Sequence, residues 1–151
     1  MLQLAVPSDL QAVNALAAQL HAPHVSWRPD LFAETEQMFP PERFAEAVKQ
    51  RQLYVFKLEG TVVGYTVLKM RTVDGPGRVL RRVMQVSEFV VEALCRRHGI
   101  GTEMMSDIRI LARAFGCTDL ELTVYPQNDE AVAFYQKCGF TIRTIGMQTK
   151  I

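Results

Sequence analysis

The feature that most constrains the fold is a β-rich run that passes through a short basic turn into a long amphipathic helix. The run covers Arg78–Val91, and Gly99 and Gly101 lead into the helix. Apolar residues then recur at helical spacing for several turns, and Gly116 supplies a C-terminal stop. Three apolar residues run together near Ser87–Val91, which predicts either a β-bulge or a strand buried on both faces.

The turn between this strand and this helix has the chemistry of an anion site. A helix N-terminus leaves its first amide N–H groups unpaired and carries a partial positive charge. Glycines let the backbone approach a ligand closely, and successive N–H groups can surround phosphate oxygens. Arg96 and Arg97 add electrostatic attraction. The same spacing also fits an ordinary strand–helix turn, so the residues alone leave both readings open.

Two common nucleotide-binding motifs do not fit this turn. A Walker P-loop requires a glycine, four residues and then Gly-Lys-Ser/Thr, and the chain has no such stretch. A dinucleotide fingerprint requires a third glycine where this chain has Met104, and it normally lies near the start of its domain.

The N-terminal half alternates between helical and strand patterns. Ser8 and Gln11 have the spacing of a capping box and predict a helix that runs to about Leu20. The following stretch, 21–39, reads as an irregular loop with short helical pieces. Further elements are then predicted in this order: a helix from Pro41 to about Gln50, a hairpin of Leu53–Glu59 and Thr61–Met70 that turns at Glu59-Gly60, and a turn at Asp74–Gly77.

The C-terminal half continues the mixed pattern. Leu120–Val124 alternates apolar and polar residues and predicts a strand. Asn128 is a helix cap followed by acidic residues, and Gly139 ends that helix. Phe140–Ile145 and Met147–Ile151 are predicted as the last strands.

Composition narrows the class of protein. A chain of 151 residues fits one domain, 1–151, and its net charge of +1 argues against a nucleic-acid partner. The basic cluster Arg78, Arg81 and Arg82 reads as a solvated strand end. Three cysteines without metal or redox spacing favour a reducing cytosol. No signal peptide or membrane-spanning run is recognisable, so a soluble cytoplasmic protein without a membrane partner is expected.

Two motifs resemble those of a known family. Arg96-x-x-Gly99-x-Gly101 resembles the coenzyme A signature of the GNAT superfamily of N-acetyltransferases. The helix that Asn128 caps, which ends in Phe-Tyr-x-x-x-Gly-Phe at Phe134–Phe140, resembles the second signature of that family. The resemblance implies an α+β fold with a mixed, mostly antiparallel sheet that is splayed at its centre and flanked by helices.

The resemblance also implies a site for acetyl-coenzyme A and no metal. The cosubstrate would lie in the opening of the sheet, with its pyrophosphate on main-chain amides of the glycine turn. Tyr135 would place its hydroxyl near the thioester sulfur. The residues that the resemblance assigns to the cosubstrate are Phe89, Val90, Val91, Arg96, Arg97, His98, Gly99, Ile100, Gly101, Thr102, Asn128 and Tyr135.

The implied reaction is acetyl transfer to a primary amine by direct attack in a ternary complex. Tyr135 is then the candidate general acid for the departing sulfur, and Glu88 is the candidate base for the amine proton. The acceptor would be a small molecule or a peptide amine, and a homodimer is plausible by analogy with relatives. The alternative is a domain of this fold that binds acyl-coenzyme A or a partner without turnover.

Several other residues have an ordinary structural reading. His21 and His24 are interpreted as surface or packing residues. Cys95 and Cys138 are interpreted as small buried thiols, because no accompanying His–Asp or His–Asn arrangement is evident. Three aromatic residues could line the acceptor side or belong to the core, and the sequence does not separate the two: Trp27, Phe32 and Phe39.

Overall fold

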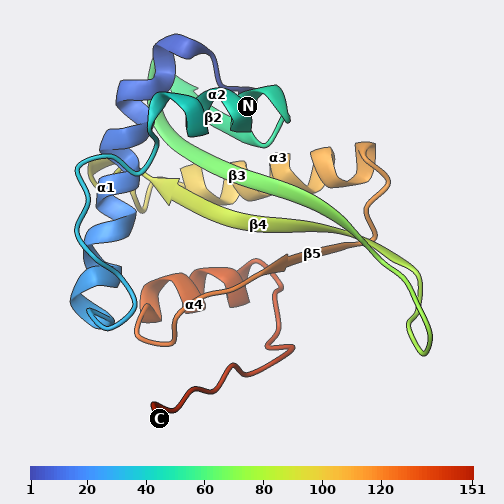
Figure 1. Ribbon diagram of the computed structural model, residues 1–151. Helices are drawn as coiled ribbons and strands as arrows, with labels where there is room; N and C mark the ends of the chain where they lie inside the picture. Colours follow the sequence, from blue (N-terminus) through green and yellow to red (C-terminus); the bar gives the residue numbers. More distant parts are fainter.

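Five strands form one mixed sheet in the computed structural model, which describes residues 1–151 (Figure 1). The spatial order follows the sequence: β1 (Leu2–Leu4), β2 (Leu53–Leu58), β3 (Thr61–Val73), β4 (Arg81–Val91) and β5 (Asp119–Leu122). Neighbours pair antiparallel except β4 and β5, which are parallel. This confirms the predicted mixed, mostly antiparallel sheet, to which β1 is an addition that the sequence did not signal.

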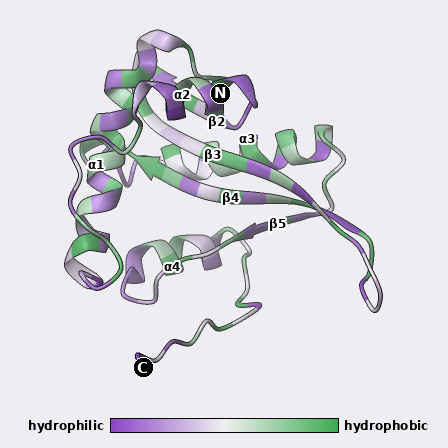
Figure 2. Cartoon of the chain, viewed as in Figure 1, coloured by the Kyte–Doolittle hydropathy of each residue, from purple (hydrophilic) through white to green (hydrophobic).

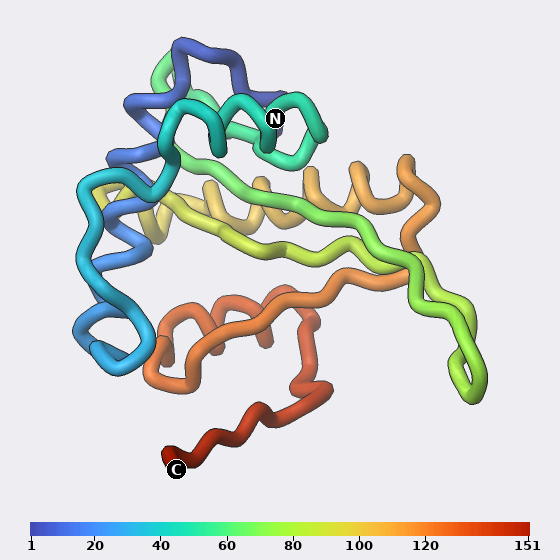
Figure 3. The backbone as a smooth tube through the Cα atoms, in the orientation of Figure 1, coloured from blue at the N-terminus to red at the C-terminus, as the bar shows by residue number.

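Four α-helices flank the sheet. The core contains one cluster around Val13 of α1 and Phe44 of α2, and another around Met104 of α3. Figure 3 follows the same path as a backbone tube, and Figure 2 shows hydrophobic and hydrophilic segments alternating along the helices. The helices are α1 (Leu10–Trp27), α2 (Pro41–Lys49), α3 (Ile100–Ala114) and α4 (Asp129–Lys137), with 3-10 turns at Pro7–Asp9 and Ala93–Cys95. None of the helices combines the length and apolar character that spanning a bilayer requires.

Strand β4 contains a bulge, which is one of the two alternatives that its sequence left open. Val67 of β3 pairs with Glu88, and the next residue of β3, Leu68, pairs with Val86, so Ser87 is an extra residue. The bulge sets which side chains face each layer. Phe89 packs in the cluster that contains α3, whereas Val90 packs in the cluster that contains α1 and α2.

The sheet opens beyond this bulge. Strand β5 pairs with β4 only as far as Val86, opposite Leu122. Strand β4 continues to Val91 along β3, so the edge of Ser87–Val91 that faces away from β3 has no strand partner. Figure 1 shows β5 and its continuation diverging from β4 toward α4. The splayed sheet is therefore confirmed.

The first helix differs from its prediction at both ends. Ser8 lies inside the 3-10 turn, and α1 begins at Leu10 without a side-chain cap, so the capping box was wrong. Instead the Asp9 carboxylate accepts a hydrogen bond from the amide of Val6 at 3.0 Å. The helix also continues through Pro23, because a proline removes one helical hydrogen bond while packing can hold the rest. The irregular segment is therefore 28–40.

The predicted C-terminal strands are absent. Residues 141–151 make no hydrogen bond between main-chain groups, and every one of them is exposed. Side chains provide the contacts: Arg143 reaches Glu121 at 3.4 Å, and Arg28 donates to Gln148 at 2.8 Å. The prediction of strands at Phe140–Ile145 and Met147–Ile151 was wrong, because a strand needs a partner strand and nothing in the chain pairs with this segment.

Gly64 offers a test of how closely the layers pack. A Cβ at this position would lie 2.7 Å from the sulfur of Met104 and 3.0 Å from the carbonyl oxygen of Val90. We expect Gly64→Ala to lower the free energy of unfolding by about 1–3 kcal/mol, as overpacking does. Denaturant unfolding measures this change. Gly146→Ala is the control, because a Cβ there meets nothing within 4 Å, and equal stabilities of both variants would contradict the prediction.

Candidate functional site

The turn between β4 and α3 presents a row of unpaired main-chain donors. No main-chain N–H from Arg97 to Thr102 donates a hydrogen bond within the chain. The backbone is left-handed at Arg97 (φ 66°) and at Gly99 (φ 86°), with His98 between them outside that region. Alternation of this kind turns successive N–H groups toward a common point and suits an anion. The row continues into the first turn of α3, where the helix dipole is positive.

Two side chains brace the turn. The guanidinium Nε of Arg96 donates to the carbonyl of Val91 at 3.0 Å, which ties the turn to the last residue of β4. The Nδ1 atom of His98 lies 2.7 Å from the carbonyl oxygen of Arg96. Because a carbonyl only accepts, Nδ1 is the protonated nitrogen. These contacts shape the backbone and leave the amides free.

The two glycines of the turn have different structural roles. A Cβ at Gly99 would meet nothing within 4 Å, so the space beside its amide is open, and its positive φ favours glycine. A Cβ at Gly101 would lie 3.3 Å from the ring of Phe134. The second glycine therefore lets α3 approach α4 closely. Open space beside unpaired amides fits a pyrophosphate group, such as the one that coenzyme A carries.

An aromatic cluster lies beside the free part of β4. The ring of Phe89 stacks on Phe134 at 5.6 Å between centroids and meets Tyr135 edge-on at 6.1 Å. The hydroxyl of Tyr135 has no hydrogen-bond partner in the chain and is not fully buried. Desolvation, with a smaller contribution from Cys138, raises the pKa of Tyr135 to about 12. The phenol is thus a neutral, available proton donor at physiological pH.

The carboxylate of Glu88 lies on the opposite face of β4 and is held by two partners. One oxygen accepts from Arg43 at 2.8 Å, and the other accepts from the hydroxyl of Tyr65 at 2.7 Å. Burial first, and the charge of Glu88 second, raise the pKa of Tyr65. Each carboxylate oxygen keeps a further lone pair, so Glu88 can still accept a proton. The sequence did not signal Arg43 or Tyr65, because they come from α2 and β3, far along the chain.

Comparison with known proteins agrees with this geometry. Residues 18–140 match the family described as Acetyltransferase (GNAT). The chain belongs to the GNAT acetyltransferase family. No curated protein sequence is similar enough to be matched.

Solved structures place the whole chain in the GNAT fold. A tetramutant of the BH1408 protein from Bacillus halodurans is 27% identical, with a TM-score of 0.94, and the match covers 100% of this chain and 99% of that one. An acetyltransferase from Trypanosoma brucei is 22% identical, with a TM-score of 0.71, over 100% and 99% of the two chains. The aminoglycoside N-acetyltransferase AAC(6')-Iy, solved with coenzyme A, is 14% identical, with a TM-score of 0.71, over 100% of both chains.

Two helices of this GNAT chain meet the opening of the sheet from different sides. The side chain of Asn128 caps α4 by accepting from the amide of Ala131 at 3.2 Å, as the sequence predicted. From the other side, the amide of Gln19 on α1 donates to both oxygens of Glu92, and its carbonyl accepts from the amide of Ala93 at 3.0 Å. Gln19 was missed by sequence reasoning, because nothing local distinguishes it from a surface glutamine.

Of the three aromatic residues whose role the sequence left open, one belongs to the core and two lie near the opening. Phe39 is 1% exposed and packs edge-on against Tyr65, so it belongs to the core. Trp27 and Phe32 are half-buried, and both pack against His24. The same imidazole meets Tyr125, which follows β5, at 5.4 Å. These aromatic residues thus join the end of α1 to the lip of the opening that lies across from β4.

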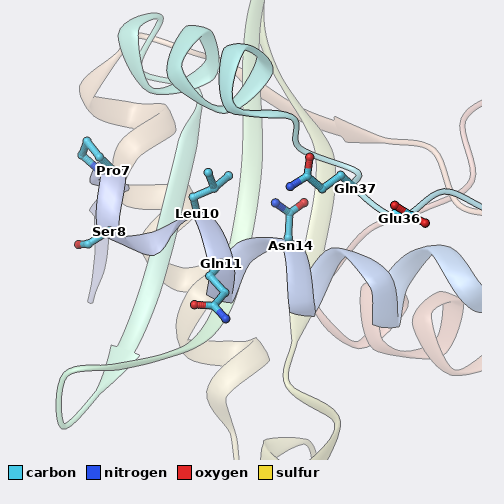
Figure 4. Close-up of a pocket in the computed structure, with 7 residues that line it drawn as sticks. All are labelled: Pro7, Ser8, Leu10, Gln11, Asn14, Glu36 and Gln37. Carbon is cyan, nitrogen blue, oxygen red and sulfur yellow. The ribbon is translucent and has the colours of Figure 1, made fainter.

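A separate shallow hollow lies at the start of α1, away from the glycine turn. Figure 4 shows its lining residues, among them Asn14, whose side chain is hydrogen-bonded to the main chain of Phe39. The hollow is lined by Pro7, Ser8, Leu10, Gln11, Asn14, Glu36 and Gln37. None of these belongs to the residues predicted for the cosubstrate.

The three cysteines are unpaired and half-buried, and burial raises the pKa of Cys117 and Cys138.

Proposed function

We propose that this GNAT protein transfers an acetyl group from acetyl-coenzyme A to a primary amine by direct attack in a ternary complex. The observation that carries the proposal is the row of unpaired amides from Arg97 to Thr102, which adjoins the unpartnered edge of β4. A backbone arranged in this way has donors for a pyrophosphate at one end and donors and acceptors for an amide-bearing chain along the strand.

Different residues would bind different parts of acetyl-coenzyme A. Amides of Arg97, His98, Gly99, Ile100, Gly101 and Thr102 would hold the pyrophosphate. Main-chain groups along Phe89, Val90 and Val91 would pair with the pantetheine portion, because that edge has no strand beside it. Arg96 would act mainly through its bond to the carbonyl of Val91, which keeps the turn in place. Asn128 would close the site from α4, in addition to capping that helix.

Two side chains would move protons. Tyr135 is neutral, lies beside Phe89 and keeps its hydroxyl free of intrachain bonds, so it suits protonation of the departing sulfur. Glu88 would take a proton from the attacking nitrogen, directly or through water. Main-chain donors near the reacting carbonyl would stabilise the oxyanion. Holding the amine and the thioester side by side would lower the activation barrier further through proximity.

One observation favours the alternative of a binding domain without turnover. Both oxygens of Glu88 are hydrogen-bonded, and Arg43 forms an ion pair with it. A proton that reaches Glu88 would have to share its oxygens with these two partners. Variants of Glu88 and Tyr135 therefore separate an enzyme from a module that only binds acyl-coenzyme A.

Binding of acetyl-coenzyme A is the first test, by calorimetry with NAD and ATP as controls. Ligand at about 100 times its dissociation constant should stabilise the fold by about 2.7 kcal/mol. Gly99→Ala should weaken binding about tenfold or more, which is about 1.4 kcal/mol, because it strains the turn. Gly77→Ala is the matched control, since that glycine also has positive φ and open space but lies in the β3–β4 hairpin. Equal affinity of both variants would contradict the assignment of the turn.

The second test concerns the two proton-transfer residues. Tyr135→Phe and Glu88→Gln should each lower kcat by about 10²-fold or more, since positioned acids and bases typically contribute this much. Affinity for acetyl-coenzyme A should stay near that of the wild type. Tyr54→Phe, in β2, is the control and should leave kcat unchanged. Release of coenzyme A at the wild-type rate in both variants would refute these two roles.

We also propose that the protein forms a homodimer through its C-terminal segment. Large apolar side chains in residues 141–151 are largely exposed, including Ile142 (75%), Ile145 (81%) and Met147 (94%). Strand β5 lies at the edge of the sheet, so its outer side has unpaired main-chain groups. A second copy would cover these side chains, and a two-fold dimer is the commonest arrangement.

Light scattering after size-exclusion chromatography tests the dimer. Wild type should elute as a dimer, and the double variant Ile142→Lys/Ile145→Lys should elute as a monomer with unchanged secondary structure. Ile110→Lys is the control, because Ile110 is 58% exposed on α3 and should leave the dimer intact. A monomeric wild type at every protein concentration would rule the dimer out.

A further inference from the structure

Acetyl transfer to a primary amine requires a step that neither Tyr135 nor Glu88 explains. A primary alkylamine is protonated at neutral pH, as lysine is with its reference pKa of about 10.4. An ammonium nitrogen has no lone pair and cannot attack a carbonyl. The site must therefore remove one proton before the attack and a second during it. The following inference identifies the first proton acceptor, and it rests on the proposed function.

Carboxylates around the opening are poorly suited to that first step, because each is already engaged. Glu88 is bonded to Arg43 and Tyr65, and Glu92 receives the side-chain amide of Gln19. Asp30 forms two hydrogen bonds with Arg28, at 2.9 and 2.7 Å. That bonding to Arg28 lowers the pKa of Asp30 to about 2. Asp30, stabilised as an anion by Arg28, therefore has little tendency to take a proton near neutral pH.

His24 has the free lone pair that these carboxylates lack. Its Nδ1 atom lies 2.7 Å from the carbonyl oxygen of Leu20, one helical turn earlier. A carbonyl only accepts, so Nδ1 carries the hydrogen, and in the neutral ring Nε2 is left with the lone pair. Nε2 has no partner in the chain, and no side-chain nitrogen or oxygen is both buried and unpaired. The basic nitrogen of His24 therefore reaches solvent.

Helix α1 places the ring of His24 beside the opening of the sheet. Gln19 binds the chain just after the free edge of β4, through Glu92 and Ala93. His24 lies five residues further along, about 7.5 Å of helix rise. There its ring packs on Tyr125, which continues from β5. Helix α1 thus spans from one side of the opening to the other, as Figure 1 shows for the lower half of the helix.

The surroundings of His24 are aromatic, with one ion pair and one further cation nearby. The imidazole is enclosed by Trp27, Phe32 and Tyr125 at centroid distances of 5.4 Å. The titratable groups around it are His21 on the same helix, the Arg28–Asp30 pair, and Tyr125, with Lys150 acting on Asp30. No unpaired carboxylate among them competes for an ammonium group. Aromatic faces also attract a cation, which favours an amine arriving in its charged form.

We propose that Nε2 of His24 accepts the proton of the incoming ammonium group and so delivers a neutral amine to the reaction. The N–H bond breaks, its electron pair stays on the amine nitrogen, and the proton passes from Nε2 to solvent. That electron pair then forms the C–N bond, and the C–S electron pair leaves with the sulfur. Glu88 takes the second amine proton and passes it to solvent, and Tyr135 gives its proton to the sulfur and regains one from solvent. One proton is released per turnover.

The kinetic test uses two amines of similar size. The 2-phenylethylamine probe is an ammonium at pH 7, whereas O-benzylhydroxylamine is already neutral. We expect His24→Gln to lower kcat/KM for 2-phenylethylamine about 10²-fold at pH 7, the usual contribution of a positioned base. The defect should disappear as the pH approaches about 10, where solvent supplies the neutral amine. Activity toward O-benzylhydroxylamine should be unchanged.

The matched control is His21→Gln, one helical turn earlier. His21 lies near the same Phe32, but its Nε2 lies 2.7 Å from the carbonyl of Ala33, and no contact joins it to Tyr125. This variant should behave as wild type with both amines. A defect of His24→Gln that is equal for both amines and at every pH would show a purely structural role and overturn the proposal.

The tautomer of His24 provides a readout that does not depend on activity. Long-range proton–nitrogen NMR spectra of the imidazoles should show hydrogen on Nδ1 of His24 and a lone pair on Nε2. Hydrogen on Nε2 in the neutral ring would overturn the inference even in an active enzyme. Failure of the wild type to bind acetyl-coenzyme A would instead refute the proposed function, and the spectrum would still report on His24.

Discussion

The early end of pairing between β4 and β5 is the constraint on which the rest of the site depends. Pairing stops at Val86, next to the extra residue Ser87, and β4 then runs on with one edge bare. Because the bulge shifts the alternation by one residue, Phe89 lies in the same cluster as Val86, whereas Glu88 bonds to Tyr65 of the opposite cluster. One irregularity in the hydrogen bonding therefore creates the open edge and also separates the aromatic side of the site from its carboxylate side.

An open sheet edge needs neighbours that hold its shape without pairing with it. Arg96 binds the last carbonyl of β4, Gln19 binds the residues just beyond it, and the ring of Phe89 stacks on Phe134 of α4. These contacts come from side chains or from residues outside the edge. Apart from the carbonyl of Val91, which Arg96 occupies, they do not use main-chain groups on the bare edge, and a ligand that binds through backbone contacts requires such groups to be available.

Local signals predicted the parts of the fold whose cause is local. The glycine turn and the cap at Asn128 could be predicted directly, and an irregularity near Ser87 could be predicted as one of two alternatives, because each depends on a few neighbouring residues. Sequence patterns failed to predict the structure where contacts with residues distant in the sequence determine it. The continuation of α1 past Pro23 and the absence of C-terminal strands depend on what else packs or pairs there. In the same way, the sequence around Glu88 did not predict its hydrogen bonds to Arg43 and Tyr65. The unpaired position of Nε2 of His24 likewise depends on the packing of three separate segments.

The distribution of charge at the opening explains how a nearly neutral chain could serve both a polyanionic cosubstrate and a cationic acceptor. Anion affinity comes from amides and a helix dipole, so it needs no large excess of basic side chains. Acidic groups nearby are each bonded to a partner: Asp30 to Arg28, Glu88 to Arg43, and Glu92 to the neutral amide of Gln19. An approaching ammonium group therefore meets aromatic faces and an imidazole rather than a free carboxylate. A strong ion pair would stabilise the ammonium and oppose its deprotonation, whereas an imidazole beside aromatic rings lets the amine enter and then lose its proton.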